Sequence, residues 1–90
     1  MAHARCEATI RNKLGLHARP AMAFVDLANR YQSEVRVIKG RQNVDGKSIM
    51  QMMLLAATQG TRLVIEARGG DAREACKALE ALILDKFDEE

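Results

Sequence analysis

The residues best suited to chemistry surround a histidine at the start of a helical segment. Residues 15–21 read Gly-Leu-His-Ala-Arg-Pro-Ala, so His17 directly precedes the helix and Pro20 falls in its first turn. The first backbone N–H groups of a helix lack acceptors within it, and together with the helix dipole they favour a bound anion. Imidazole is a nucleophile near neutral pH, and Arg19 can contact phosphoryl oxygens. The segment therefore predicts a phosphoryl group on His17, with a capping or loop histidine as the alternative.

A second segment, residues 46–51, reads Gly-Lys-Ser-Ile-Met-Gln and has two interpretations. Ser48 and Gln51 match the Ser-x-x-Gln capping box, in which two unpaired amides at the helix start are satisfied reciprocally. A serine at a helix start is also a position where the helix dipole favours a phosphate. The segment therefore predicts a helix cap at Ser48 and a place suited to regulatory phosphorylation.

The helix predicted after Ser48 is apolar on all sides. Its large apolar side chains are Ile49, Met50, Met52, Met53, Leu54 and Leu55. A short helix on a small domain cannot bury every side, so about half of these residues are expected to face the sheet. The others are expected on the surface, where adaptable methionines suit contact with several partners.

Alternating apolar residues and turn signals predict four strands. They are expected at residues 6–10, 34–39, 41–44 and 62–68. Gly40 supplies the turn of a hairpin between the second and third strands, and Asp45-Gly46 ends that hairpin.

Helical periodicity predicts three helices, at residues 18–32, at 48–55 and from Asp71 onward. Gly60 is expected to close the second helix and Asp71 to cap the third. The third helix carries an apolar stripe of Ala72, Ala75, Cys76, Leu79, Leu82, Ile83 and Phe87. The order is βαββαβα, an α+β arrangement with helices on one face of a four-stranded antiparallel sheet.

Composition sets limits on the function. The 90 residues are expected to form a single domain, 1–90, with 48% hydrophobic residues and a net charge of +2. The small charge and 3% aromatic content argue against nucleic-acid binding. Residues 1–7 do not form a signal peptide, and the longest apolar run, 52–57, is too short to span a membrane. Cys6 and Cys76 are expected to be buried free thiols rather than a disulfide or metal site.

These motifs resemble the HPr family of bacterial phosphocarrier proteins over nearly the whole chain. Residues 15–21 resemble the family's active-site signature, and Gly-Lys-Ser-Ile-Met at 46–50 resembles its regulatory-serine signature at the expected distance. Gln-Gly-Thr at 59–61 and the strand after it match as well. The resemblance implies an open-faced β-sandwich, with four antiparallel strands and three helices on one side.

The resemblance also implies a role in the phosphoenolpyruvate-dependent phosphotransferase system. His17 is expected to accept a phosphoryl group through Nδ1 from enzyme I, with help from Arg19, and to pass it to enzyme II A-type proteins. HPr kinase/phosphorylase is expected to modify Ser48 and transcriptional regulators to bind. The residues expected to contact partners are Ala18, Pro20, Lys47, Ile49, Met50 and Met53. The protein is then a monomeric cytoplasmic carrier for sugar uptake or regulation rather than an enzyme, without cofactor, metal, nucleic acid or membrane contact.

Two positions depart from the family pattern. Leu14 stands where many relatives have a small polar residue, and Asp26 where some have a lysine that faces enzyme I. Two alternatives stay open: a regulatory protein-binding module, and a carrier in a nitrogen-type phosphorelay. The retained His17 argues against the purely regulatory role, because HPr-like proteins of that kind typically lack the histidine.

Overall fold

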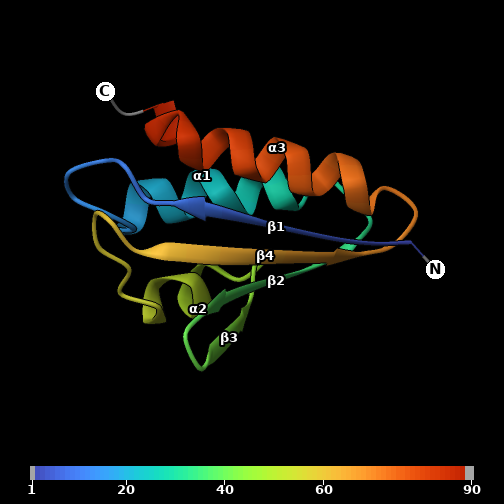
Figure 1. Cartoon of the computed structure of the whole chain (residues 1–90), viewed down its shortest axis with the longest axis horizontal. Helices are drawn as coiled ribbons and strands as arrows, with labels where there is room; N and C mark the ends of the chain where they lie inside the picture. The colour runs from blue at the N-terminus through green and yellow to red at the C-terminus, as the bar shows by residue number, and fades with distance from the viewer. Residues whose placement is uncertain (1, 89–90) are drawn as a thin grey trace.

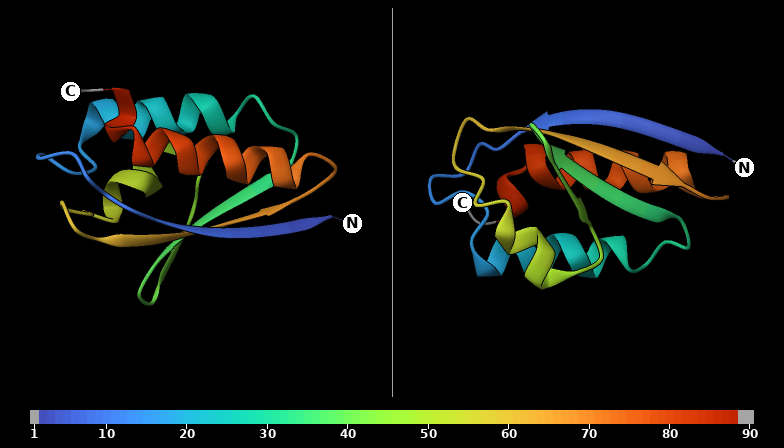
Figure 2. Two further views of the ribbon diagram at one scale, coloured as in Figure 1. Left: turned by 45° about the horizontal axis from the view of Figure 1, so that its top comes forward. Right: turned by 90° about the horizontal axis from the view of Figure 1, so that it is seen from below.

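The chain folds into one antiparallel sheet with its helices packed on one face. The structure, a computed structural model, describes residues 2–88. The elements are β1 (His3–Thr9), α1 (Ala18–Ala28), β2 (Glu34–Lys39), β3 (Gln42–Asp45), α2 (Ile49–Leu54), β4 (Arg62–Arg68), α3 (Ala72–Leu84) and the 3-10 turn η1 (Lys86–Asp88). The left view of Figure 2 shows α1 and α3 as a layer over the sheet. The predicted βαββαβα order and α+β architecture are confirmed.

The strands lie in the order β1-β4-β2-β3, so the last strand in the sequence is inside the sheet (Figure 1). β4 pairs with β1 from His3↔Arg68 to Thr9↔Arg62, and with β2 from Glu34↔Arg68 to Ile38↔Val64. β1 begins at His3 rather than at the predicted residue 6, because its pairing runs the full length of β4. The predicted bounds of β2 and β4 are confirmed.

The core lies between the sheet and the helices. Alternate residues of β2 and β4 point into it, and Val35, Val37, Leu63, Ile65 and Ala67 are fully buried. The apolar stripe predicted for the last helix is buried apart from Leu82, which packs partly against the core. Its last residue, Phe87, lies in η1 rather than in α3, which ends at Leu84. Each fully buried large apolar side chain stabilises the fold by about 1.5–3 kcal/mol. This packing holds both long helices rigidly on the sheet.

α1 ends at Ala28 rather than at residue 32. The Asn29 side-chain amide donates to Val25 O (2.9 Å), and the N–H of Tyr31 donates to Ala28 O (3.2 Å). Bonds to the third preceding carbonyl tighten the last turn and end an α-helix. The local competition of an asparagine for its own helix carbonyl therefore shortens α1.

The prediction that Gly60 closes α2 is wrong. α2 ends at Leu54, with Leu55 as its C-cap, and the left-handed residue that follows is Ala56 (φ +48). Gly60 (φ +91) instead lies in a turn in which Thr61 N–H donates to Thr58 O. The carbonyls at the end of α2 accept from the hairpin, because Lys39 Nζ donates to Leu55 O (2.8 Å) and Gln42 Nε2 to Leu54 O (3.3 Å).

Asp71 occupies the N-cap position of α3, but its side chain makes no cap hydrogen bond, so the predicted cap is corrected. Its carboxylate instead accepts from Ser33 Oγ and from the N–H groups of Gln32 and Ser33 (both 2.9 Å). The hydrogen bond from Ser33 and those from the backbone hold the pKa of Asp71 below its usual value. The carboxylate thus joins the α1–β2 turn to the start of α3.

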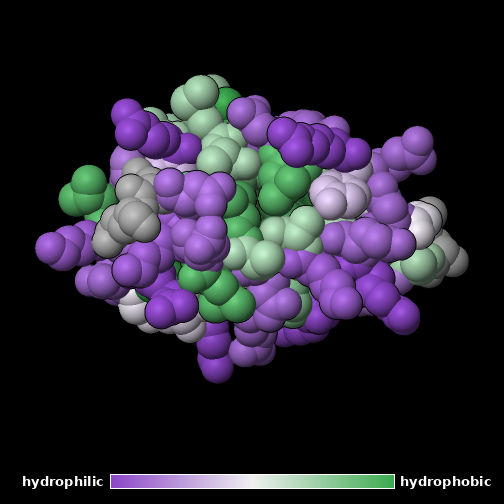
Figure 3. Space-filling view, turned by 90° about the horizontal axis from the view of Figure 1, so that it is seen from above, coloured by the Kyte–Doolittle hydropathy of each residue, from purple (hydrophilic) through white to green (hydrophobic). Residues whose placement is uncertain are grey.

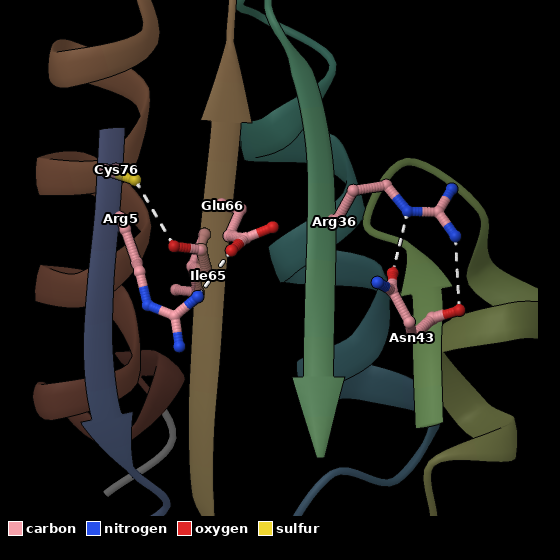
Figure 4. Close-up of polar contacts among 6 residues, drawn as sticks. All are labelled: Arg5, Arg36, Asn43, Ile65, Glu66 and Cys76. Carbon is pink, nitrogen blue, oxygen red and sulfur yellow. Dashed lines mark hydrogen bonds and ion pairs between the residues drawn. The ribbon is translucent and has the colours of Figure 1, made fainter. Parts of the chain in front are cut away.

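The sheet face away from the helices carries charges that pair with one another. Arg5 pairs with Glu66, and the Arg36 guanidinium donates to the Asn43 side chain (2.9 Å) and carbonyl (3.1 Å), as Figure 4 shows. A hollow of about 260 Å³ on this face is lined by Glu34, Arg36, Asn43, Glu66 and Arg68. The arginines Arg5 and Arg36 on this face are thus paired with acidic or polar groups of the same face.

Cys6 and Cys76 are free thiols on the core side of the sheet. Cys76 is buried as predicted and donates to Ile65 O (3.7 Å; Figure 4), whereas Cys6 is only half-buried and donates to Cys76 O (3.6 Å). Burial, reinforced by the neighbouring Cys76, raises the pKa of Cys6 to about 12, and burial also raises the pKa of Cys76. Both groups therefore stay protonated thiols near neutral pH.

Apolar side chains also reach the surface between α1 and α3. Figure 3 shows this hydrophobic band between hydrophilic regions. A hollow of about 300 Å³ there is lined by Ala23, Asp26, Leu27, Arg30, Leu82 and Asp88. Within residues 2–88, no helix combines the length and the apolar composition needed to cross a membrane.

Candidate functional site

His17 is the N-cap residue of α1, with φ −87° and ψ −168°. Its N–H donates to Gly15 O (3.1 Å), and its carbonyl accepts the first helical bond from Ala21 N–H (3.0 Å). The side chain makes no capping hydrogen bond to the helix. The capping-histidine alternative is therefore wrong, and the half-exposed ring lies at the helix start without a capping role.

One ring nitrogen of His17 is shielded from solvent. Nε2 is buried, although the residue as a whole is half-exposed. This burial disfavours Nε2 as the ring atom that a docking partner approaches.

The first turn of α1 provides the surroundings that an anion on this ring would need. Pro20 has no N–H, so the helix-start amides next to His17 are those of Ala18 and Arg19. The helix has no acidic residue in its first turn, and the Arg19 side chain is exposed. Amides, helix dipole and guanidinium thus all favour negative charge beside His17.

The loop before His17 is fixed by the α2–β4 loop. Leu16 N–H donates to Ala57 O (2.8 Å), and Gly15 adopts φ +68 with no room for a Cβ, which would lie 2.5 Å from Ala57 O. The buried Asn12 side chain donates to Gly15 O (2.8 Å). Sequence reasoning missed Asn12 as a positioning residue. The only signal in the sequence is that this asparagine lies three positions before a glycine, because asparagine side chains often form hydrogen bonds with nearby backbone groups in turns.

Ser48 caps α2 as predicted, because its Oγ accepts from Gln51 N–H (3.2 Å). The reciprocal half of the capping box is different. The Gln51 side chain accepts from Asp45 N–H (2.9 Å), while Ser48 N–H donates to Asp45 O (3.1 Å). The tight Asp45–Ser48 turn uses the Ser48 amide, so the Gln51 side chain bonds the amide of Asp45, three residues earlier, instead. Ser48 itself remains half-exposed.

The apolar residues of the α2 segment divide between core and surface as predicted, although two of the six rather than about half are buried. Met52 and Leu55 are fully buried, whereas Ile49, Met50, Met53 and Leu54 are exposed. Leu14 in the β1–α1 loop and Met22 on α1 are exposed as well. We call these six exposed residues, Leu14, Met22, Ile49, Met50, Met53 and Leu54, the apolar surface. The segments that carry them lie at the left end of the molecule in Figure 1.

The other residues expected to contact partners occupy different environments. Ala18 is exposed, but Pro20 is fully buried and lies beneath the surface. The expectation that Pro20 touches a partner is therefore corrected, because a buried ring supports only the shape of the helix start. Lys47 Nζ donates to Tyr31 O (2.7 Å) and so ties the β3–α2 turn to the end of α1. Within residues 2–88, His, Cys, Asp and Glu side chains form no group of three that could hold a metal ion.

Comparisons with known proteins find relatives over nearly the whole chain. A family model described as "PTS HPr component phosphorylation site" matches residues 4–85. The chain is 52% identical over 84 residues to the phosphocarrier protein HPr of Pseudomonas aeruginosa, covering 92% of this chain and 93% of that protein. It is 42% identical over 83 residues to the phosphocarrier protein NPr of Proteus mirabilis, covering 90% and 91%.

A solved structure is also similar. The HPr-C-His structure from Thermoanaerobacter tengcongensis superposes with a TM-score of 0.92 at 45% identity, covering 97% of this chain and 98% of that one.

Proposed function

The chain belongs to the HPr family of phosphocarrier proteins, and we propose that His17 Nδ1 is the atom that carries the phosphoryl group. As a member of this family the protein is a phosphocarrier of the phosphotransferase system, PTS. The observation that carries the assignment is the position of His17. Its ring lies at the start of α1 without a capping bond and with Nε2 buried, beside the Ala18 and Arg19 amides.

Each transfer exchanges one bond to phosphorus for another. Nδ1 of His17 donates its lone pair to the phosphorus of phosphorylated enzyme I, and the bond to the donor breaks with its electron pair left on the donor. In the second transfer, a histidine of an enzyme II A-type protein attacks, and the electron pair returns to Nδ1. Such transfers depend on positioning and charge stabilisation, which Arg19 and the helix amides supply. A docked partner excludes water.

The apolar surface is the proposed docking site for enzyme I and the enzyme II A-type proteins. Six large apolar side chains exposed on neighbouring segments of one end suit contact with several partners in turn. Ala18 and Arg19 are the first residues of α1, which carries Met22, and Lys47 lies two residues before α2 begins at Ile49. Because one face meets successive partners, the protein acts as a monomeric, stoichiometric relay in the cytoplasm rather than as an enzyme.

Ser48 is the proposed regulatory site. Its half-exposed Oγ directly precedes Ile49 and Met50 of the apolar surface. A phosphate there places about two negative charges beside side chains that must lose water on docking. Phosphorylation by HPr kinase/phosphorylase therefore slows transfer from enzyme I.

A nitrogen-type phosphorelay is the second candidate. The observation that favours it is the 42% identity to a protein named NPr, which exceeds the 40% identity to one of the proteins named HPr. The same histidine, arginine and helix start serve either relay.

The test uses phosphoenolpyruvate, enzyme I and the intact mass of the protein. We expect one added phosphate that is lost in acid and absent in His17→Ala. The matched control is His3→Ala, which removes the other histidine at the start of β1 and should accept phosphate normally. Unchanged acceptance by His17→Ala, or loss only in His3→Ala, would contradict the assignment.

A further inference from the structure

The methionines differ sharply in exposure. Met22, Met50 and Met53 are 49%, 81% and 44% exposed, whereas Met52 is fully buried. Met50, Met52 and Met53 are close in sequence and lie on the same short helix, α2. Among residues 2–88, the fold therefore separates three thioethers that solvent can reach from one that it cannot.

Met22, Met50 and Met53 all lie on segments next to the histidine site. Met22 is on α1, the helix that begins directly after His17, and Met50 and Met53 are on α2. The two helices pack against each other, and the β1–α1 loop is bonded to the segment that follows α2 through Leu16 N–H and Ala57 O. Three of the six side chains in the apolar surface are thus thioethers.

We propose that Met22, Met50 and Met53 form an oxidant-sensitive modification site, at which hydroperoxides convert the thioethers to sulfoxides and thereby weaken docking of enzyme I. This inference rests on the proposed function, because it takes the apolar surface as the docking site. In the reaction a sulfur lone pair attacks the outer oxygen of the peroxide. The O–O bond breaks, the oxygen stays on sulfur, and hydrogen peroxide leaves as water, so sulfur loses two electrons and the peroxide gains them.

A sulfoxide changes the surface in a way that opposes docking. The thioether is apolar and adaptable, whereas the sulfoxide oxygen is a strong acceptor that is hydrated before docking. Burying it against an apolar partner strips away that water without supplying a donor. The fold itself is preserved, because Met52 in the core is shielded from the oxidant.

The cysteines do not compete for the oxidant. Peroxides react with thiolates, and burial together with the neighbouring thiol raises the pKa of Cys6 to about 12. Cys76 is buried and its pKa is raised as well. Mild oxidation is therefore directed to the exposed thioethers around His17.

The test oxidises the isolated protein with hydrogen peroxide, removes the peroxide, and then adds enzyme I and phosphoenolpyruvate. Peptide mass mapping should find Met50, Met22 and Met53 oxidised ahead of Met52. The kcat/KM for transfer from enzyme I should fall about tenfold and recover after treatment with methionine sulfoxide reductases. Each protein is compared with its own unoxidised sample, so a change in the basal rate does not affect the result.

Two variants make the test specific. The triple variant Met22→Leu/Met50→Leu/Met53→Leu should lose the sensitivity to peroxide, with a ratio of oxidised to unoxidised rates near one. Met52→Leu, the matched control, should keep it. Full transfer after oxidation of all three methionines, or equal sensitivity of the triple variant, would overturn the inference while leaving His17 as the carrier. If the unoxidised protein accepts no phosphoryl group, the proposed function fails first and the inference falls with it.

Discussion

Replacing Gly15 by alanine should destabilise the loop that positions His17, and the structure allows the loss to be estimated. Gly15 adopts φ +68, which costs an L-residue about 1–2 kcal/mol. An added Cβ would lie 2.5 Å from Ala57 O and 2.9 Å from Thr58 Cα, both backbone atoms. Moving backbone to make room costs about 1–3 kcal/mol further.

Part of this cost is offset, because alanine restricts the unfolded chain by about 0.4–1 kcal/mol relative to glycine. We therefore expect Gly15→Ala to lower the free energy of unfolding by about 2–4 kcal/mol. The matched control is Gly40→Ala. Gly40 has φ +58, but no atom lies within 4 Å of a Cβ built on it. Alanine at position 40 would therefore bear only the cost of the left-handed backbone conformation, and we expect the free energy of unfolding to fall by about 1 kcal/mol or less.

Urea unfolding at equilibrium measures both variants, and the transfer rate from enzyme I measures the effect on His17. Gly15→Ala should also slow the transfer, because the clash falls on the carbonyl that accepts from Leu16 N–H, directly before His17. Gly40→Ala, in the distant β2–β3 turn, should not. Equal losses of stability in the two variants would refute the close-approach argument. A destabilised Gly15→Ala with an unchanged transfer rate would refute the link between the loop and His17.

Four further variants, at three positions, test other parts of the structure. Asp71→Asn should lower stability at neutral pH and flatten the acid side of the pH–stability curve. The folded-state pKa of Asp71 is depressed below 3.8, so its contribution is present above that value and is lost as pH falls through the folded pKa; an unchanged acid limb would contradict this. Ser48→Ala should lower the free energy of unfolding in urea by about 1 kcal/mol through loss of the cap. Ser48→Asp keeps a cap but should slow transfer from enzyme I. An unchanged transfer rate would contradict the proposed regulatory role of Ser48. Asn12→Leu should lower the free energy of unfolding by about 0.5–1.5 kcal/mol, because the Gly15 carbonyl loses its side-chain donor but still accepts from His17 N–H. A loss below the error of the measurement would show that the Asn12 bond does not fix the loop.

Much of the fold could be predicted because its signals are local. The alternation of β2 and β4 fixed their bounds, and the 3.6-residue stripe of α3 identified its buried face. The position of His17 at the start of α1 followed from Pro20 and the helical pattern behind it. In each of these cases, residues close together in the sequence are enough to indicate the element and its position.

Apart from the early end of α1, which Asn29 causes locally, the errors occurred where segments distant in the sequence compete for the same groups. Asp71 bonds Ser33 from the α1–β2 turn instead of capping its own helix. Gly60 is placed by the two loops that meet beside β1, since its N–H donates to Ile10 O. The burial of Pro20 and of His17 Nε2 likewise depends on tertiary packing. Periodicity in one segment carries no information about such contacts.

The central claim is tested most directly by NMR of the protein labelled with ¹⁵N in its histidines and phosphorylated by enzyme I and phosphoenolpyruvate. The account predicts a ¹⁵N–³¹P coupling at Nδ1 of His17 and none at His3. A coupling at Nε2 of His17, at His3, or a phosphate found only on Ser48 would contradict it.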